Sequence, residues 1–402
     1  MKSILTILCL SPLAATAQAQ QPITLEQALR SARENRPAIV AAQMRVSSAR
    51  LSRRGLGAYP TTKLFVGHTD REEVGGIDDD LVLVQPIDIF GRAAAARAVG
   101  SAEILRAESE LAQVLAEIQY EVIAGYSEAA SAKALADNAG QLMELAQRLH
   151  DAVKVLVAEG KLPGVQLSRV AIELERAKLT FQRRTAEFQS SVRRLAGILG
   201  LSPEQIAISD FATLNVGMVD PAVLKTRRAD LRLLAADIQL AQAESRVANL
   251  GSKPELEVHG RQTSWHDSHR QYGIRVQLAI PLYDFGKSRS ETAAARMRAE
   301  AAERALADAT RIAESELLAA QIELESAQEQ VARYGQVVTD ARSLVDKSRQ
   351  GFVDRAVTLI ELLEATRALR ELEEGYVEAR LHLASAQAAY LKASGTILEV
   401  GK

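Results

Sequence analysis

One eight-residue motif occurs twice in this sequence, as Gln85-Pro86-Ile87-Asp88-Ile89-Phe90-Gly91-Arg92 and again as Ile280-Pro281-Leu282-Tyr283-Asp284-Phe285-Gly286-Lys287. The offset between the copies is 195 residues (281 minus 86). The same offset pairs Leu167 with Leu362 and Gly200 with Gly395, so the register persists well beyond the motif. A persistent offset indicates an internal duplication, and it predicts that the two halves share one fold.

Each half is predicted to contain the same elements in the same order. These are a shorter helix, a strand, a turn-rich loop, a second strand, a very long helix, a turn with glycine and another long helix. We place the first repeat at 20–201 and the second at 221–402, joined by a linker at 202–220. Pro203, Pro221 and the polar stretch between them mark that linker.

The long helical hairpins, expected at 92–199 and 288–395, carry apolar residues at alternating spacings of three and four. No proline interrupts 92–161 or 287–402, so the first long helix would measure on the order of 100 Å at about 1.5 Å per residue. The period of 3.5 residues is typical of coiled coils, and a layered α-barrel and a plain antiparallel coiled coil share it. The clearest series is Leu317, Ala320, Leu324, Ala327, Val331, Tyr334, Val338, Ala341 and Val345.

Between the helices of each half, two segments change from the helical period to strict alternation. We predict strands at about 61–69, 80–88, 255–265 and 272–283. Alternation of this kind is typical of outer-membrane barrel strands, although a strand of a soluble sheet that covers a core has the same pattern. Four strands are too few to close a barrel, whereas three copies would supply twelve (three times four), an even number in the observed range.

Aromatic residues gather near the ends of these strands, which predicts girdles at a membrane interface. Ordinary packing at the junctions is the alternative for the helix-proximal set. The distal loop at 264–271 holds His266, Asp267 and His269, and without a further fixed ligand this group predicts no metal site. The helix-proximal aromatic residues are Tyr59, Phe90, Tyr283 and Phe285, and the distal ones are Trp265 and Tyr272.

The amino-terminal segment 1–19 has the features of a secretory signal peptide: Lys2, a short apolar run and small residues at the cleavage region. Cys9, the only cysteine, lies inside it, so the processed chain would carry no thiol or disulfide. The 49 basic and 51 acidic residues are interleaved and give a net charge of −2, which predicts no nucleic-acid surface. The rest of the chain contains no apolar run long enough for a membrane helix, so a membrane-integral form would use β-strands.

The repeated motif and three further segments together resemble the TolC family of outer-membrane efflux proteins over nearly the whole mature chain. The compact length and the form Gln85-Pro86-Ile87-Asp88 are similar to the heavy-metal efflux branch of that family. The three further segments are Ile23-Thr24-Leu25-Glu26-Gln27-Ala28-Leu29, Asn35-Arg36-Pro37 and Leu362-Leu363-Glu364-Ala365.

The resemblance implies a mainly α fold with a small β part. In the implied homotrimer, four strands per chain form a twelve-stranded outer-membrane β-barrel that continues into a periplasmic α-barrel. The implied function is an exit duct of a tripartite efflux or type I secretion system, which passively conducts substrates from an inner-membrane pump through a periplasmic adaptor. It implies no cofactor and no enzymatic activity.

The resemblance also implies positions for the working parts. The adaptor (a membrane fusion protein) and the pump would dock at the helical tips, where short turns that only connect helices are the alternative. The tips comprise Gly160, Lys161, Gly164, Gly351, Asp354 and Arg355, and the barrel–helix junction comprises Pro86, Phe90, Gly91, Pro281, Phe285 and Gly286.

The same family carries acidic residues on the helix after the second tip, where Glu361 and Glu364 stand in this chain and aspartate is commoner. A spacing of three places both carboxylates on one helix face, and threefold symmetry would turn them into rings that favour cations. The first half has Gln166 and Arg169 at the equivalent places, so the constriction would belong to the second half. A solvated coiled-coil face is the alternative.

No set of residues in the sequence matches a catalytic constellation. The histidines are scattered, and the serines have no neighbouring elbow or dyad pattern. The phosphate-binding pattern Gly-x-x-x-x-Gly-Lys-Ser/Thr is missing too, which predicts a channel that does not use ATP. The main rival is a periplasmic coiled-coil adaptor or scaffold with small β modules, and a secreted hydrolase on a helical scaffold is the weaker one.

Overall fold

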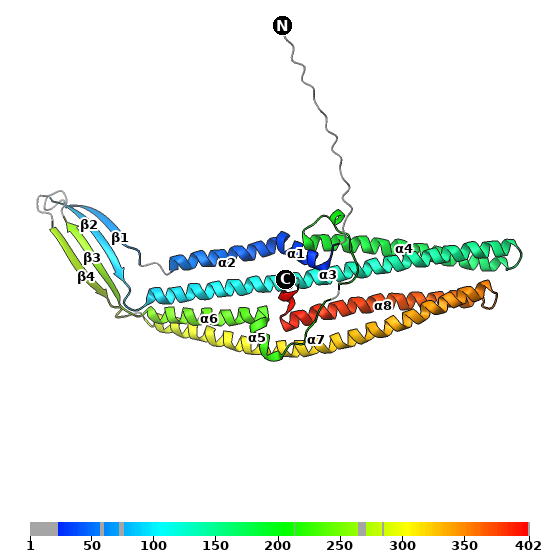
Figure 1. The fold of residues 1–402 in the computed structure, drawn as a ribbon. Coiled ribbons are helices and arrows are strands. Elements are labelled where there is room, and N and C mark those ends of the chain that lie inside the picture. Colours follow the sequence, from blue (N-terminus) through cyan, green and yellow to red (C-terminus); the bar gives the residue numbers. More distant parts are fainter. Residues whose placement is uncertain are drawn as a thin grey trace, which may run out of the picture.

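The chain folds into a long rod with a small β-sheet at one end and two helical tips at the other (Figure 1). The structure is a computed structural model that describes residues 23–56, 60–71, 76–212, 214–263, 271–283 and 285–400. The expected fold class, mainly α with four strands and long antiparallel helices in two repeats, is confirmed. The predicted signal peptide, Tyr59, Trp265 and the histidines of the distal loop lie outside the described residues.

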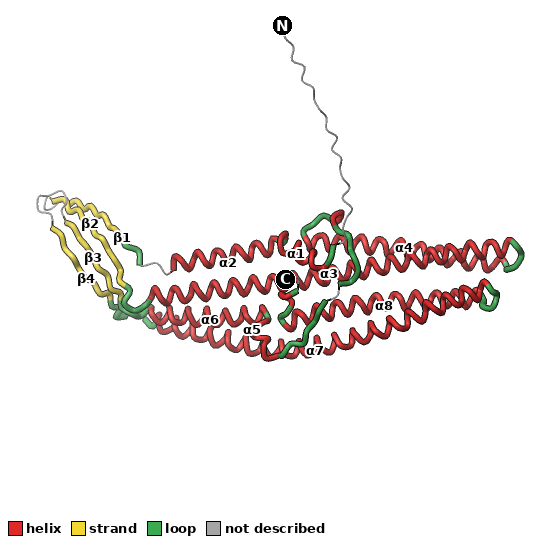
Figure 2. The backbone as a smooth tube through the Cα atoms, viewed as in Figure 1, coloured by secondary structure: helices red, strands yellow, loops and turns green. Residues whose placement is uncertain are grey.

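Two helices of 67 residues run the length of the rod, and two of 36 residues fold back along them from the tips (Figure 2). Toward the sheet the helices lie side by side in the order α2, α3, α6 and α7, and toward the tips in the order α4, α3, α8 and α7. Each of these two sets of four helices therefore has a helix of the first repeat at one edge and α7 of the second repeat at the other. The helices are α1 (Leu25–Asn35), α2 (Pro37–Leu56), α3 (Arg92–Ala158), α4 (Gly164–Leu199), α5 (Leu224–Arg227), α6 (Ala229–Leu250), α7 (Lys287–Val353) and α8 (Leu359–Ser394).

The offset of 195 residues holds at the boundaries of these helices. Gly91 and Gly286 precede α3 and α7 with φ values of 78° and 82°. Gly200 and Gly395 follow α4 and α8 with φ values of 69° and 76°. A left-handed residue directly after a helix satisfies the last carbonyl groups, and glycine adopts that conformation without a Cβ clash. The same two turns in each half give hairpins of equal length.

Four antiparallel strands form one sheet in the order β1-β2-β3-β4, so among the described residues β1 and β4 have no partner strand on their outer edges. The bounds differ from the expected ones by a few residues: β2 begins earlier, at Gly76, and β4 ends at Ala279 and not at 283. Pro281 lacks the N–H that would continue the ladder, which accounts for the early end of β4. The strands are β1 (Lys63–Arg71), β2 (Gly76–Ile87), β3 (Glu255–Thr263) and β4 (Gln271–Ala279).

One face of this sheet is lined by apolar side chains. Leu64, Leu83, Val258 and Val276 share one face through the strand register, and Leu64, Leu83 and Val276 are about half exposed or more. No helix among the described residues combines the length and apolar composition needed to cross a membrane.

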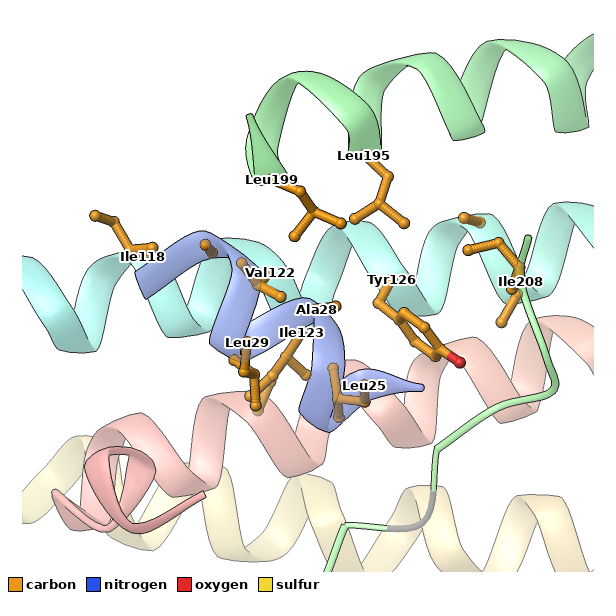
Figure 3. Packing of buried hydrophobic residues seen from close by; sticks show 14 of the residues in the cluster. Leu25, Ala28, Leu29, Ile118, Val122, Ile123, Tyr126, Leu195, Leu199 and Ile208 are labelled. Carbon is orange, nitrogen blue, oxygen red and sulfur yellow. The ribbon is translucent and has the colours of Figure 1, made fainter. Parts of the chain in front are cut away.

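The main core lies at the middle of the rod, where α1 packs into the angle between α3 and α4 (Figure 3). A capping box between Thr24 and Gln27 starts α1, which places Leu25, Ala28 and Leu29 on its buried face. Most of the predicted heptad positions on α7 are buried as well, which confirms the coiled-coil seam. The residues labelled in Figure 3 are Leu25, Ala28, Leu29, Ile118, Val122, Ile123, Tyr126, Leu195, Leu199 and Ile208.

The linker at 202–220 wraps the rod at the level of this core and is fastened to the long helices by side chains. The Tyr126 hydroxyl donates to the carbonyl of Ile23 at 3.1 Å and shares a 2.8 Å hydrogen bond with Ser209. The Tyr390 hydroxyl accepts from the N–H of Val219 at 3.1 Å. The guanidinium of Arg380 lies 4.3 Å from the centre of the Phe211 ring. These contacts fix the course of the linker between the two repeats.

Candidate functional site

The two tips are built alike, because their turns close with the same hydrogen bonds. In the first, the carbonyl of Leu156 accepts from the N–H of Lys161 at 2.9 Å. In the second, the carbonyl of Gly351 accepts from the N–H of Ala356 at 2.7 Å, at the same offset of 195 residues (351 minus 156). Gly160 has a φ of 72°, and its counterpart Arg355 has a φ of 60°. Arg355 thus holds a conformation that costs a residue with a side chain about 1–2 kcal/mol.

Relief of that strain gives a first prediction. Arg355→Gly is expected to raise the free energy of local opening at the second tip by about 1 kcal/mol, because glycine adopts the left-handed region freely. Hydrogen exchange at the amide of Ala356 would report the change. Gly160→Ala is the matched control, with no atom within 4 Å of the added Cβ, and it is expected to shift exchange at Lys161 in the opposite direction. Faster exchange at Ala356 in the glycine variant would contradict the prediction.

A small apolar cluster joins the tips of the two hairpins. Val153 of α3, Val170 of α4 and Leu359 of α8 are buried together, and Leu162 and Phe352 pack against them. The two tips therefore form one compact end of the rod. The charged turn residues Lys161, Asp354 and Arg355 are exposed and point away from this cluster. Of the predicted tip glycines, Gly160 and Gly164 are exposed and Gly351 is half-buried.

Glu361 stands in the third position of α8 and closes a capping box with Thr358. Its carboxylate accepts from the backbone N–H of Thr358 at 2.7 Å and from the Thr358 hydroxyl at 2.9 Å. In return, the Thr358 hydroxyl accepts from the N–H of Glu361 at 3.3 Å. The signal for this contact is the pattern Thr-x-x-Glu before an apolar run, and the sequence interpretation missed it.

The capping hydrogen bonds lower the pKa of Glu361, chiefly through the backbone N–H of Thr358. A carboxyl group whose pKa is depressed on folding contributes its stability above its unfolded pKa, which is near 4.5. That contribution is lost as the pH falls through the lower, folded pKa. Glu361 is therefore anionic throughout the neutral range.

Glu364 lies three residues further along α8 and is exposed. Within the described ranges, no hydrogen bond or ion pair involves its carboxylate. The first repeat differs at this place: Pro163 precedes α4 without a side-chain cap, and Gln166 and Arg169 replace the two glutamates. The charge that the sequence predicts at the second tip thus has no counterpart at the first.

Ion pairs beyond the tip link the two hairpins, and the sequence interpretation did not include them. Arg367 of α8 contacts Glu173 of α4, and Arg184 of α4 lies 3.4 Å from Glu374 of α8. Burial by itself would lower the pKa of Arg184, but the hydrogen bond to Glu187 and the charge of Glu374 together outweigh burial and raise that pKa. These pairs fix how the second hairpin lies against the first.

At the other end of the rod, the repeated motif forms the junction between sheet and helices. The Asp88 carboxylate accepts from the N–H groups of Arg92 and Ala93, both at 2.8 Å, and these bonds lower its pKa, the Ala93 bond most. The Arg92 guanidinium reaches across to Glu255 at 2.6 Å. The first junction is thus tied to the start of α3 and to β3.

The second junction exposes two aromatic side chains. Phe285 is 92% exposed with a φ of 52°, and its ring meets that of Tyr283 edge to face at 5.1 Å. Pro281 and Gly286 belong to the same turn, and Pro86, Phe90 and Gly91 are their counterparts. Both rings lie beyond the end of β4, at the helix-proximal end of the sheet where the sequence places them.

Comparison with known proteins identifies part of this architecture. Residues 221–396 match the family model described as outer membrane efflux protein. The chain contains an outer membrane efflux protein domain. This efflux domain begins at Pro221, covers β3, β4 and α7, and ends after α8, so it holds the second tip with Glu361 and Glu364. The family resemblance expected from the sequence motifs is confirmed.

The chain is also similar to individual known proteins. It is 26% identical over 227 residues to outer membrane protein TolC of Vibrio cholerae, and it spans about half of that relative's length, 52%. The fold resembles that of the outer-membrane channel OprN, with a TM-score of 0.78, 19% identity and coverage of 92% of this chain and 89% of that one. For the outer membrane protein VceC of Vibrio cholerae, the TM-score is 0.77 at 17% identity, with 92% and 96% covered.

Proposed function

We propose that three copies of this chain form an exit duct in the outer membrane that extends into the periplasm. The duct conducts passively, and its substrates come from an inner-membrane pump through a periplasmic adaptor. The observation that carries this proposal is that the outer edges of the sheet and of both sets of helices have no neighbour in the part of the chain that the structure describes. The efflux domain and the likeness in fold to outer-membrane channels support it.

The edges are of different kinds on the two sides of the chain. One side presents β1, α2 and α4, all from the first repeat, and the other presents β4 and α7 from the second. Val165, Ile172 and Leu179 form an exposed apolar row on α4 with a spacing of seven, the heptad period of a helix that has a partner. A contact between unlike edges repeats from copy to copy, and it closes into a ring when the rotation allows.

Ring closure would also provide hydrogen-bond partners for the two edge strands of the sheet. The outer edges of β1 and β4 expose backbone N–H and C=O groups, which are costly to leave unpaired in lipid. If β1 of one copy pairs with β4 of the next, three copies give a closed barrel of twelve strands (three times four). The face with Leu64, Leu83 and Val276 would then lie toward lipid.

The mass of the protein in detergent tests the proposal. We expect the mature chain to purify as a trimer by light scattering. The double variant Ile172→Glu/Leu179→Glu should dissociate, because charges would enter the edge between copies. Val155→Glu, an equally exposed apolar position on α3, is the control and should stay trimeric. A monomer that is freely soluble without detergent would overturn the duct and favour the periplasmic adaptor or scaffold.

The second proposed element is a constriction at Glu361 and Glu364. In planar bilayers, the double variant Glu361→Gln/Glu364→Gln is expected to raise the permeability to anions severalfold, since the rings of negative charge would be lost. Glutamine preserves the capping box, as Gln27 does with Thr24 in α1, so charge is removed without loss of the helix start.

Glu159→Gln provides the control for this measurement. Glu159 is an exposed carboxylate at the first tip, where it pairs with Lys161 at 2.6 Å. Its removal changes the charge at the same end of the rod but not on α8. The constriction would be disproved if the double variant kept the ion selectivity of the unaltered duct, or if Glu159→Gln shifted it as much.

We further propose that the exposed turn residues at the tips form the surface that receives the adaptor. The support is their exposure next to a rigid apolar cluster, which presents Lys161, Asp354 and Arg355 outward. The variant Lys161→Glu/Arg355→Glu should abolish efflux in cells while leaving pore conductance in bilayers unchanged. Full efflux by this variant would remove the tips from the docking surface.

A further inference from the structure

The two outer edges of the sheet have the same length. β1 (Lys63–Arg71) and β4 (Gln271–Ala279) contain nine residues each, and neither has a neighbour on its outer side among the strands that the structure describes. A proline borders each edge at the end nearest the helices, because Pro60 precedes β1 and Pro281 follows β4. Proline has no N–H to donate, so the run of hydrogen-bond donors stops at the same end of the sheet on both edges.

The register within the chain determines how far neighbouring copies in a ring must be staggered. Lys63 pairs with Val84, Val84 with His259, and His259 with Arg275. A path perpendicular to the strands that starts at Lys63 therefore reaches β4 at Arg275. In a closed barrel the strands are tilted, so this path does not arrive at Lys63 of the next copy. It arrives at a residue displaced along β1, and the shear of a ring of three copies is three times that displacement.

Two general requirements limit this displacement. Successive side chains point to opposite faces, so only an even displacement places the apolar face of β4 beside the apolar face of β1. With about 3.3 Å per residue and about 4.8 Å between strands, displacements of two, four and six residues tilt twelve strands by about 19°, 35° and 46°. Tilts of about 35–45° are typical of barrels, so displacements of four and six remain.

Backbone hydrogen bonding distinguishes the remaining displacements. A displacement of four toward the distal end places Gly67 opposite Arg275, and all nine residues of one edge then oppose the nine of the other. A displacement of six places Lys63 opposite Pro281 and leaves two residues of each strand without a partner in the other. A displacement of four in the reverse direction leaves only Lys63 opposite Gln271. Unpaired backbone groups are costly in lipid, so the first arrangement is the most stable.

We infer that β1 of one copy pairs antiparallel with β4 of the next in one register, with Lys63 opposite Ala279 and Arg71 opposite Gln271. The inference rests on the proposed duct of three copies and specifies which residues of the two edges meet. The ring then has a shear of twelve (three times four). The ladder ends where Pro60 and Pro281 end the supply of donors on both sides.

This register also brings apolar side chains together across each contact between copies. Leu64 lies opposite Leu278, and Val66 lies opposite Val276. These four side chains are 50–66% exposed in the single chain, and directly opposite side chains of a ladder contact each other. The apolar face of the sheet therefore continues from copy to copy.

Cysteine cross-linking tests the register, because Cys9, the only native cysteine, lies in the predicted signal peptide. In Val66→Cys/Val276→Cys, the two Cα atoms of neighbouring copies would lie about 4.5–5.5 Å apart, within the range of a disulfide. Within one chain the two positions lie on opposite edges of the sheet, at least about 14 Å apart, which is too far for a disulfide. Mild oxidation of the trimer in detergent should therefore give covalent dimers and trimers on a denaturing gel, and a reducing agent should remove them.

Two further pairs represent the other displacements. Val66→Cys/Leu278→Cys would lie directly opposite at a displacement of six, and Val66→Cys/Ile274→Cys at a displacement of two. In the inferred register both are diagonal pairs about 7–8 Å apart, so they should cross-link severalfold more slowly than Val66→Cys/Val276→Cys. Leu64→Cys/Leu278→Cys belongs to the inferred register and should cross-link as fast, so the test does not depend on one variant.

The outcomes separate the register from the duct itself. Fastest cross-linking through Val66→Cys/Leu278→Cys or Val66→Cys/Ile274→Cys would overturn the register and leave the duct standing. A trimer that gives no covalent product with any of these pairs would show that β1 and β4 do not meet, which also overturns the register. If the unaltered protein is monomeric in detergent, the proposed function fails, and the register fails with it.

Discussion

Gly395→Ala is expected to lower the free energy of unfolding by about 3 kcal/mol, one of the largest effects of any single methyl group in this chain. Gly395 follows α8 with a φ of 76°, and an added Cβ would lie 2.7 Å from the backbone carbon of Arg227 and 2.7 Å from the nitrogen of Arg228. Backbone at the α5–α6 elbow cannot move aside without shifting Leu224 and Leu231, which are fully buried. Left-handed strain and a backbone clash therefore act together.

The internal repeat provides the matched control. Gly200 occupies the same place after α4 with a φ of 69°, and an added Cβ would meet the Asn35 side chain at 3.2 Å. The contact is with the Asn35 Cβ and is about 0.5 Å longer than the contacts at Gly395, so the neighbour needs to shift by only a few tenths of an ångström. Gly200→Ala should therefore cost less, about 1–2 kcal/mol, mostly from the left-handed backbone. Urea denaturation of the protein in detergent would compare the two. Equal destabilisation would show that the elbow is not held rigidly against Gly395.

Tyr126→Ala is expected to cost about 3–5 kcal/mol, because it leaves a large cavity in the core between α1, α3 and α4. The ring is 1% exposed, and its hydroxyl contacts Ile23, Ser209 and the carbonyl of Asp210. Tyr126→Phe keeps the ring and removes these hydrogen bonds, so a loss of about 1–3 kcal/mol is expected from the buried carbonyl groups left without a donor.

Limited proteolysis of the linker would distinguish the two parts of this effect. Tyr126→Phe should speed cleavage near Ser209, since the hydroxyl holds the linker against α3. Tyr390→Phe serves as the control, because it removes only the bond to Val219 at the far end of the linker. If Tyr126→Phe left both stability and cleavage unchanged, the hydroxyl would not be what fastens the linker.

The duplication made much of the fold predictable from sequence. Repeated motifs, heptads and the alternating segments are local patterns, and each depends on residues only a few positions apart. The turn after each long helix could be placed because Gly200 and Gly395 share one offset. Strand ends were less certain, since the end of β4 depends on Pro281 and on which N–H groups the neighbouring strand needs.

Only part of the candidate site could be predicted from the sequence. The charge at Glu361 and Glu364 is visible in the sequence, and so is the Thr-x-x-Glu pattern that makes Glu361 a helix cap. The pairing of Arg367 with Glu173 is not, because it depends on how two helices 194 residues apart are rotated against each other. The left-handed backbone of Arg355 can be inferred from the sequence only by aligning the two repeats, which places Arg355 opposite Gly160.

The matching lengths of the two hairpins limit how this chain can change in evolution. A single residue inserted into α7 would lift the second tip by about 1.5 Å and turn everything beyond it by about 100°. Leu359 would then lose its place beside Val153 and Val170. Insertions and deletions should therefore accumulate in the linker and the strand loops. The two helical hairpins should gain or lose residues only together, in steps that restore the heptad phase.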